Sequence, residues 1–224
     1  MTIAISGCSA INRRSSFQKA LDFITFPLRA FTLFEDDRFG LSSLATERFD
    51  YVAGQVQGYC LDVGCGRHNR FIRDFCGNRG KGIDVYKYEG LTDDNIVEDI
   101  TSFPFADHSF QTVTFIANIN HIPRSYRDQE LKEAYRVCKP GGNIIVTMGN
   151  PLAEILVHQV VRIYDRFLNT NFDVDGERGM EEEEEYYLTD REIISRLESA
   201  GFRMIKKVYF KTQWFLNAMF IGTR

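Results

Sequence analysis

The sequence predicts one α/β domain built around a largely parallel sheet. Short apolar runs near 59–63, 81–85, 112–117 and 143–148 alternate with segments of helical pattern. Such alternation implies crossover connections between parallel strands. The 224 residues are enough for one such domain with a substantial core and hardly enough for two.

Composition narrows the class of protein. The 44% hydrophobic and 26% charged content is typical of a soluble globular protein, and a net charge of −4 gives no basic field, so we expect no nucleic-acid partner. No apolar run reaches about 18 residues, so we expect no membrane span. The first ten residues lack the basic start of a signal peptide. Five cysteines without a C-x-x-C pair indicate reduced core residues, and we expect a cytoplasmic protein.

Two helices are expected before the sheet, as an N-terminal helical cap over residues 1–57 ahead of a core at 58–224. In the first helix, Pro27 should end or kink the chain near Phe26. This helix should pack over the sheet core; the alternatives are a lid over an apolar pocket and, more weakly, a membrane-surface role. A second helix should run from Ser42 or Ser43 to Gln55. The apolar stripe of the first helix consists of Phe17, Leu21, Ile24, Leu28 and Phe31.

A glycine turn follows the first strand. The apolar run ends in Asp62-Val63 and continues as Gly64-Cys65-Gly66. Glycines let a ligand lie against the backbone, and a following helix would offer unpaired N–H groups. Eighteen residues after Gly66, Asp84 ends a second strand, roughly the spacing at which Rossmann-like folds place a carboxylate on a ribose.

These residues resemble motif I of the class I S-adenosylmethionine-dependent methyltransferases, with a methyltransferase type 11-like domain. Further matching segments are Glu98-Asp99-Ile100, 109–113 and 136–142, so the resemblance covers about residues 56–150. It implies a Rossmann-like, doubly wound, seven-stranded sheet, mostly parallel with a reversed last strand and helices on both faces. We expect a third strand near 95–98 and a terminal antiparallel pair at 204–210 and 214–221. The family's third glycine position holds His68.

The resemblance implies S-adenosyl-L-methionine as the cofactor. Its methionyl group would lie across the glycine turn, its ribose hydroxyls would donate to Asp84, and its adenine would meet the Asp99 side chain and the Ile100 N–H. The predicted cofactor-binding residues are Asp62, Gly64, Cys65, Gly66, Asp84, Val85, Asp99, Ile100, Ala117 and Asn118.

His121 follows the fourth strand in the sequence. It is the candidate general base, because histidine changes charge near neutral pH. Its alternative role is to order its loop. Asn120, His121, Tyr186 and Tyr187 are the predicted substrate residues, and the acid-rich stretch 169–188 is a candidate lid. We expect no metal site. The predicted reaction is methyl transfer to a small-molecule, lipid or sugar-type acceptor, at oxygen.

Two other classes of function stay open. An NAD(P)-dependent oxidoreductase is disfavoured by the missing third glycine and the lack of a Tyr-x-x-x-Lys pair in the right place. The third reading is a non-catalytic nucleoside-binding protein of Rossmann-like fold. The oligomeric state is not predicted, and a homodimer is one of the outcomes left open.

Overall fold

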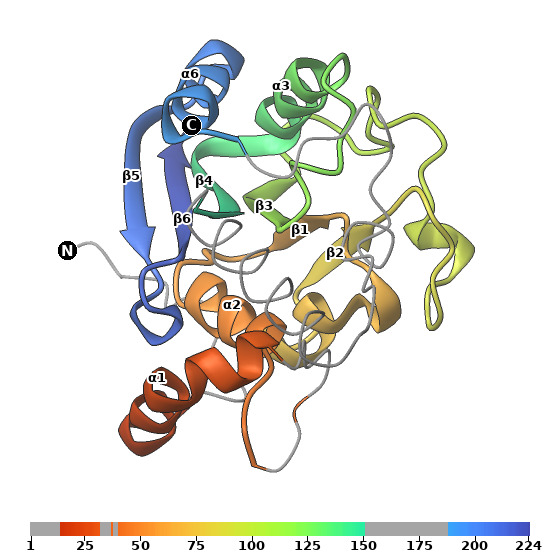
Figure 1. Ribbon diagram of the computed structural model, residues 1–224. Coiled ribbons are helices and arrows are strands. Elements are labelled where there is room, and N and C mark those ends of the chain that lie inside the picture. Colours follow the sequence, from red (N-terminus) through yellow and green to blue (C-terminus); the bar gives the residue numbers. More distant parts are fainter. Residues whose placement is uncertain (1–13, 32–36, 38–39, 151–187) are drawn as a thin grey trace, which may run out of the picture.

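The computed structural model describes residues 14–31, 37, 40–150 and 188–224 (Figure 1). Short 3₁₀ turns (η1, η3, η4) and one short π turn (η2) join the longer elements. In chain order the elements are α1 (Ser16–Phe31), α2 (Leu44–Ala53), β1 (Cys60–Val63), η1 (Arg67–Asn69), η2 (Phe71–Phe75), β2 (Gly80–Ile83), η3 (Asp93–Asn95), β3 (Phe110–Ile116), α3 (Arg127–Val137), β4 (Cys138–Gly149), α6 (Asp190–Ala200), β5 (Arg203–Tyr209), η4 (Lys211–Gln213) and β6 (Asn217–Thr223).

The strands form one sheet in the order β2-β1-β3-β4-β6-β5. The first four strands in this order are parallel, and β6 runs antiparallel to both β4 and β5. The predicted fold class, the reversed last strand and the terminal antiparallel pair are therefore confirmed. The described residues contain six strands, so the seventh predicted strand is not confirmed.

The predicted third strand at 95–98 is wrong as a strand. This segment makes one isolated bridge, between Asp84 and Ile96. The Asp84 N–H donates to the Asn95 carbonyl (2.8 Å), and the Val97 N–H donates to the Asp84 carbonyl (2.9 Å). The segment after Val97 is polar and turns at Asp99, whose carboxylate accepts from the Thr101 N–H (2.8 Å), so the pairing stops after one bridge.

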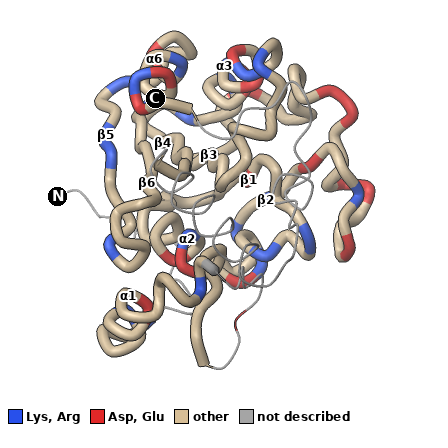
Figure 2. Tube along the Cα trace, viewed as in Figure 1, with Lys and Arg blue, Asp and Glu red and all other residues tan. Residues whose placement is uncertain are grey.

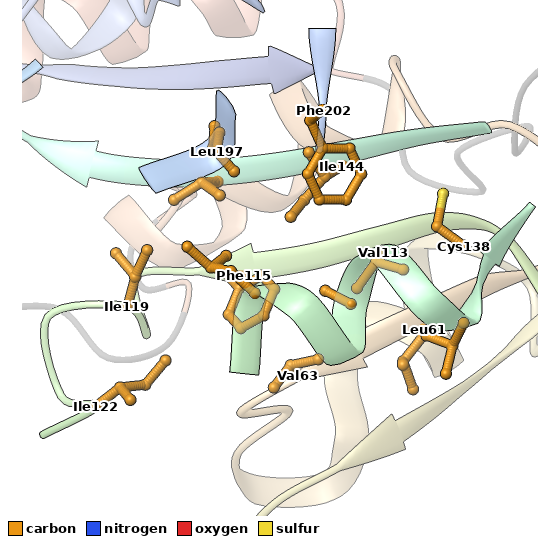
Figure 3. Close-up of a cluster of buried hydrophobic side chains, with 14 of the residues drawn as sticks. Leu61, Val63, Val113, Phe115, Ile119, Ile122, Cys138, Ile144, Leu197 and Phe202 are labelled. Atoms are coloured by element: carbon orange, nitrogen blue, oxygen red, sulfur yellow. The ribbon is translucent and has the colours of Figure 1, made fainter. Parts of the chain in front are cut away.

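Helices cover both faces of the sheet (Figure 1). On one face, α3 and α6 pack over a cluster that includes Val113, Phe115, Ile144 and Leu197 (Figure 3). On the other face, α2 and η2 pack over a second cluster that contains Val52, Phe71, Phe75 and Phe210. The sequence pattern also predicts a helix from about Arg127 to Val137, and α3 spans these residues. The N-cap of α6 is Thr189, whose side chain accepts from the Glu192 N–H (3.3 Å), and its C-cap is Gly201 with φ of 115°.

The first helix differs from its prediction in two ways. α1 continues through Pro27 to Phe31, so of the two predicted effects of Pro27, an end or a kink near Phe26, the end is wrong. Its apolar stripe does not pack on the core: Phe17 is 77% exposed and Ile24 is 72% exposed. The polar residues Asp22 and Arg29 are buried in their place, because they find charged partners in Arg14 and in Glu47 of α2.

The sequence also predicts a helix near 152–168. This helix and nearly all of the predicted 169–188 lid fall on residues that the structure does not describe. The division into a cap and a core stays a prediction. Four cysteines (Cys60, Cys65, Cys76 and Cys138) are described, and all are buried thiols outside any disulfide. Within the described residues, no helix has the length and apolar character that a membrane crossing requires.

Candidate functional site

Three parallel strands end side by side at one edge of the sheet. Val63 of β1 is in register with Ile83 of β2 and with Phe115 of β3. The residues that follow these strands therefore leave the sheet together, and they include Gly64 and Asp84. In open α/β sheets, ligands bind at this carboxyl edge.

The glycine turn is held by its own backbone. The N–H groups of Gly64 and Cys65 both donate to the Ile83 carbonyl (2.9 and 3.1 Å), and the Gly66 N–H donates to Asp84 Oδ2 (2.9 Å). These amides order the turn, so the predicted contact between them and a ligand carboxylate finds no support in the geometry. Gly66 has open space on the side where a side chain would lie. Its φ is 61°, and a Cβ added there would meet no atom within 4 Å.

The predicted helix after the turn is replaced by two short pieces, η1 and η2, of three and five residues. The cause is local: His68 and Asn69 adopt left-handed backbone, with φ of 59° and 46°, which no α-helix tolerates. The His68 ring lies against Gly90, where a Cβ would overlap it. The histidine at the family's third glycine position is thus accommodated by a glycine elsewhere, which the sequence did not reveal.

Asp84 fixes the geometry of this edge. Besides the bond from Gly66, its Oδ1 accepts from the Tyr86 N–H (3.1 Å), and the residue is 8% exposed. Each carboxylate oxygen can accept more than one hydrogen bond, so acceptor capacity remains for ligand hydroxyls. The next residue, Val85, is 46% exposed and lies beside it in the chain.

Asp62 lies beneath the turn as a buried carboxyl group. The Thr114 hydroxyl donates to its Oδ1 (2.7 Å). Burial raises the pKa of Asp62 to about 8, the hydrogen bond from Thr114 lowers it, and the nearby Asp84 raises it. Burial thus favours the protonated, neutral form of Asp62 beneath the turn. Burial also raises the pKa of the Cys65 thiol, which keeps it from acting as a thiolate nucleophile.

Asp99 is exposed and engaged in a turn. Its Oδ1 accepts from the Thr101 hydroxyl (2.6 Å) and from the Thr101 N–H (2.8 Å), and these two bonds hold the pKa of Asp99 below its usual range. Ile100 is half-buried against the main core. The geometry thus gives Asp99 a structural role, and its predicted contact with adenine stays a prediction.

The loop after β3 packs against the glycine turn. Ala117 has a φ of 51°, and its N–H donates to the Thr147 hydroxyl (2.8 Å). The Asn118 side chain then packs directly on Gly64, so closely that a Cβ on Gly64 would overlap it. His121 is half-buried, and its backbone N–H donates to the Asn118 carbonyl (2.8 Å).

Arg127 holds this loop, and sequence analysis missed it. It is fully buried at the start of α3, where its Nε donates to the carbonyls of Ile119 (3.1 Å) and Ile122 (2.8 Å). Its Nη2 donates to the Asn120 carbonyl (3.2 Å). An arginine at the start of a helix is usually exposed at the surface. The sequence pattern therefore gave no indication that Arg127 is buried.

Tyr186, Tyr187 and the acidic run Glu181–Glu185 lie outside the described residues. Within the described part of the chain, no group of three or more His, Cys, Asp or Glu side chains is arranged to hold a metal ion.

A family model and two curated methyltransferases match parts of this chain. A family model described as "Methyltransferase domain" matches residues 61–146. A ubiquinone/menaquinone biosynthesis C-methyltransferase (UbiE) of Desulfotalea psychrophila is 34% identical over 83 residues, which are 36% of this chain and 32% of the relative. A sterol 4-C-methyltransferase of Caenorhabditis elegans is 32% identical over 103 residues, 39% of this chain and 30% of the relative. The chain thus spans about a third of the length of these relatives.

The fold as a whole resembles solved methyltransferases. The crystal structure of an S-adenosylmethionine-dependent methyltransferase from Thermotoga maritima superposes with a TM-score of 0.57 at 16% identity. The superposition covers 92% of this chain and 99% of that one, so the likeness extends well beyond the matched domain.

Proposed function

Because residues 61–146 form a methyltransferase domain of the class I S-adenosylmethionine-dependent type, as the sequence predicted, we propose that this chain transfers a methyl group to a small-molecule acceptor. We propose a lipid or sugar-type acceptor, methylated at oxygen. The observation that carries the proposal is the convergence of Gly66, Asp84 and Asn118 at the carboxyl edge of the sheet.

The donor pocket is supported by features that fit S-adenosylmethionine. The open face of Gly66 admits a ligand against the backbone, and Asp84 keeps acceptor capacity for two ribose hydroxyls beside it. Asp62 beneath the turn accepts from the Thr114 hydroxyl (2.7 Å), and burial raises its pKa, which reduces the negative charge near a ligand carboxylate. We propose that the predicted cofactor residues from Asp62 to Asn118 line this pocket.

Bound S-adenosylmethionine supplies an already activated methyl group on a sulfonium, so the protein has mainly to orient the acceptor in line. In the proposed step the His121 imidazole takes the acceptor hydroxyl proton while that oxygen bonds to the methyl carbon. Bound S-adenosylmethionine would supply the methyl group, and its sulfur would keep the electron pair of the bond that is broken. Asn120 would help to position the acceptor, and Arg127 would keep the loop in place.

Methylation at carbon is the second candidate, because both relatives described above are named as C-methyltransferases. Carbon-13 NMR of a product made with methyl-labelled donor separates the two, since a methyl group on oxygen and one on carbon resonate in distinct regions.

Activity is tested by incubating the purified chain and methyl-labelled S-adenosylmethionine with a cell extract, followed by mass spectrometry of the metabolites. The expected result is a labelled small molecule that forms with the wild type and not with Asp84→Ala. Labelled protein or nucleic acid in place of a small molecule, or no product together with no binding of S-adenosylhomocysteine, would overturn the proposal.

The role of His121 is tested by comparing two substitutions. His121→Ala should lower turnover by roughly 10²–10⁴-fold and leave donor affinity intact, because it removes the base but not the pocket. Arg127→Ala should lower turnover, donor affinity and stability together, because the loop carbonyls lose their donor. Turnover and donor affinity should be measured across pH 5–9. Wild-type turnover by His121→Ala at every pH would end the general-base assignment.

A further inference from the structure

The surface of α1 and the turn at η4 is apolar where a water-soluble surface is ordinarily polar. The six exposed apolar residues of this surface are called the apolar patch. Four come from α1, and Figure 1 shows this helix at the margin of the molecule. Isolated exposed apolar residues need no explanation, but a contiguous group marks an interaction site. The patch consists of Phe17 (77% exposed), Ile24 (72%), Leu28 (55%), Phe23 (46%), Phe215 (50%) and Trp214 (44%).

Buried ion pairs fix this orientation of α1. On its inner side, Arg29 Nη2 donates to Glu47 Oε1 (3.1 Å), and Asp22 accepts from Arg14 (2.5 Å). All four of these side chains are almost inaccessible to water. Rotating the helix to bury Phe17 and Ile24 would break these pairs, and leaving buried charges unpaired is strongly destabilising. The apolar side is therefore held outward by the fold.

The turn at η4 is joined rigidly to α1. The Trp214 indole N–H donates to the Phe23 carbonyl (2.7 Å), and its ring lies 5.7 Å from that of Phe26. Gln213 reaches the same ionic cluster and donates to Glu47 Oε2 (2.8 Å). The turn that carries Trp214 and Phe215 is thus fixed against the helix that carries the other four patch residues.

Trp214 and Phe215 adopt strained backbone. Their φ angles are 50° and 62°, in the left-handed region that bulky residues rarely occupy. Such strain persists where the surrounding structure enforces it, and it clusters at sites of function. Here it brings two adjacent aromatic rings to the surface, each about half exposed.

The charge around the apolar patch is basic, although the whole chain carries −4. Figure 2 shows β5 and the following turn with basic residues and no acidic ones. Of these, Arg203 lies at the end of β5 away from η4, and Lys207 is paired with Asp190 (2.5 Å). On α1 the exposed charge is Lys19, because Asp22 and Arg29 are buried. Lys206 and Lys211 are exposed on the β5–η4 side.

We propose that the apolar patch docks the protein on the surface of an anionic lipid bilayer. The aromatic and aliphatic side chains would enter the interface between headgroups and acyl chains, and the neighbouring lysines would meet the anionic headgroups. Trp suits this boundary because its ring is apolar and its N–H is polar. A second copy of the chain fits less well as the partner, because a two-fold contact would bring the basic side chains of the two copies together. This inference rests on the patch and not on the proposed reaction.

The chain contains one tryptophan, and it lies in the patch, so its fluorescence reports docking directly. The full chain is titrated with phosphatidylcholine vesicles that contain about 30% phosphatidylserine, with pure phosphatidylcholine vesicles as the comparison. Docking predicts a blue shift of Trp214 emission and co-sedimentation with the anionic vesicles. Binding should weaken severalfold when salt rises from about 0.1 to about 0.5 M, because the Debye length shortens.

The double substitution Ile24→Ser with Leu28→Ser should lower partitioning by at least about tenfold, because two exposed apolar side chains leave the interface. Its emission spectrum without lipid should match the wild type and so report an intact fold. Met204→Ser is the matched control, since Met204 is 71% exposed but lies on β5 outside the patch, and it should bind as the wild type does. No blue shift on anionic vesicles, or equal binding by the double variant, would overturn the proposal. So would a blue shift that appears without lipid as the protein concentration rises, which would indicate a second copy.

Discussion

The carboxyl edge of the sheet and the apolar patch have opposite constructions. At the edge, apolar strands are buried and polar groups such as Asp84 and Asn118 gather where the strands end. At the patch, charged side chains such as Glu47 are buried and aromatic rings lie at the surface. A small polar ligand is best held by directed hydrogen bonds, whereas an extended apolar surface is matched by exposed apolar area. The contrast indicates two different partners for the two regions.

Strained backbone occurs in both regions but serves different ends. At the edge, Ala117 has positive φ and is secured by the Thr147 hydroxyl, so the strain aims the loop at the glycine turn. At the patch, Trp214 and Phe215 have positive φ and expose their rings. Each such residue costs on the order of 1–3 kcal/mol, and both regions retain it.

The largest expected effect lies in the ionic cluster behind the patch. Glu47→Gln should lower the free energy of unfolding by about 3–5 kcal/mol, because it removes the charge that two buried arginines share. Urea denaturation measures this. Asp50→Asn is the control and should cost less, because Asp50 makes one bond to Arg14 (3.2 Å) at the margin of the cluster. Equal losses from the two substitutions would contradict a central role for Glu47.

The glycine turn should respond to alanine in two different ways. Gly64→Ala combines overpacking against Asn118, roughly 1–3 kcal/mol, with strain at φ of 73°, about 1–2 kcal/mol, so stability and donor affinity should both fall. Gly66→Ala meets no neighbour, so it should cost only the strain while a methyl group fills the ligand face. Thermal unfolding and calorimetry with S-adenosylhomocysteine test both variants. Wild-type affinity in Gly66→Ala would show that the ligand does not lie against this residue.

A substitution of Asp84 tests whether ligand binding at the carboxyl edge is independent of binding at the apolar patch. Asp84→Asn keeps the shape but removes a charged acceptor, so S-adenosylhomocysteine should bind about 1.5–3 kcal/mol more weakly. Vesicle binding through the patch should not change. Asp93→Asn, at an exposed pair with Lys87, is the matched control and should leave donor affinity unaltered. If both variants bind like the wild type, Asp84 does not belong to the site.

The smallest effect concerns two glutamates on α3 and depends on pH. Burial raises the pKa of Glu130 to about 8, so the folded state keeps a proton that the unfolded chain releases above about pH 4, and stability falls as pH rises between those values. Glu130→Gln should remove this fall and gain at least about 1 kcal/mol relative to wild type between pH 5 and pH 8. Urea unfolding at these pH values measures it.

Glu133 is the control with the opposite sign. The hydrogen bond from Arg136 holds the pKa of Glu133 below its usual range, so its stabilising contribution is present above the unfolded pKa and is lost as pH falls through the folded pKa. Glu133→Gln should therefore destabilise at neutral pH, and the difference from wild type should shrink in acid. A difference that is independent of pH in both variants would contradict these assignments.

The sequence predicted the sheet well because its strands are marked by apolar runs and its helices by caps. Ser43, for example, was one of the two predicted starts of the second helix and is the N-cap of α2. The candidate site was predicted in part, since the glycine turn and Asp84 follow from their spacing. Arg127 and the packing of His68 on Gly90 could not be predicted, because they depend on side chains far apart in sequence meeting in space.

The first helix shows why periodicity alone can mislead. An apolar stripe predicts which side of a helix is buried only if the polar side has no better partner. In α1, Arg29 and Asp22 reach Arg14 and Glu47, and four charges satisfied together hold the polar side inward. The prediction of a core-facing stripe was wrong for that reason. The apolar side of α1 lies at the surface instead and contributes to the patch.

The most direct test of the account is calorimetric titration of the full chain with S-adenosylhomocysteine and, separately, with NADH. We predict that one S-adenosylhomocysteine binds per chain, that Asp84→Asn weakens it, and that the Ile24→Ser and Leu28→Ser double variant binds it like the wild type. Binding of NADH without binding of S-adenosylhomocysteine would contradict the methyltransferase assignment.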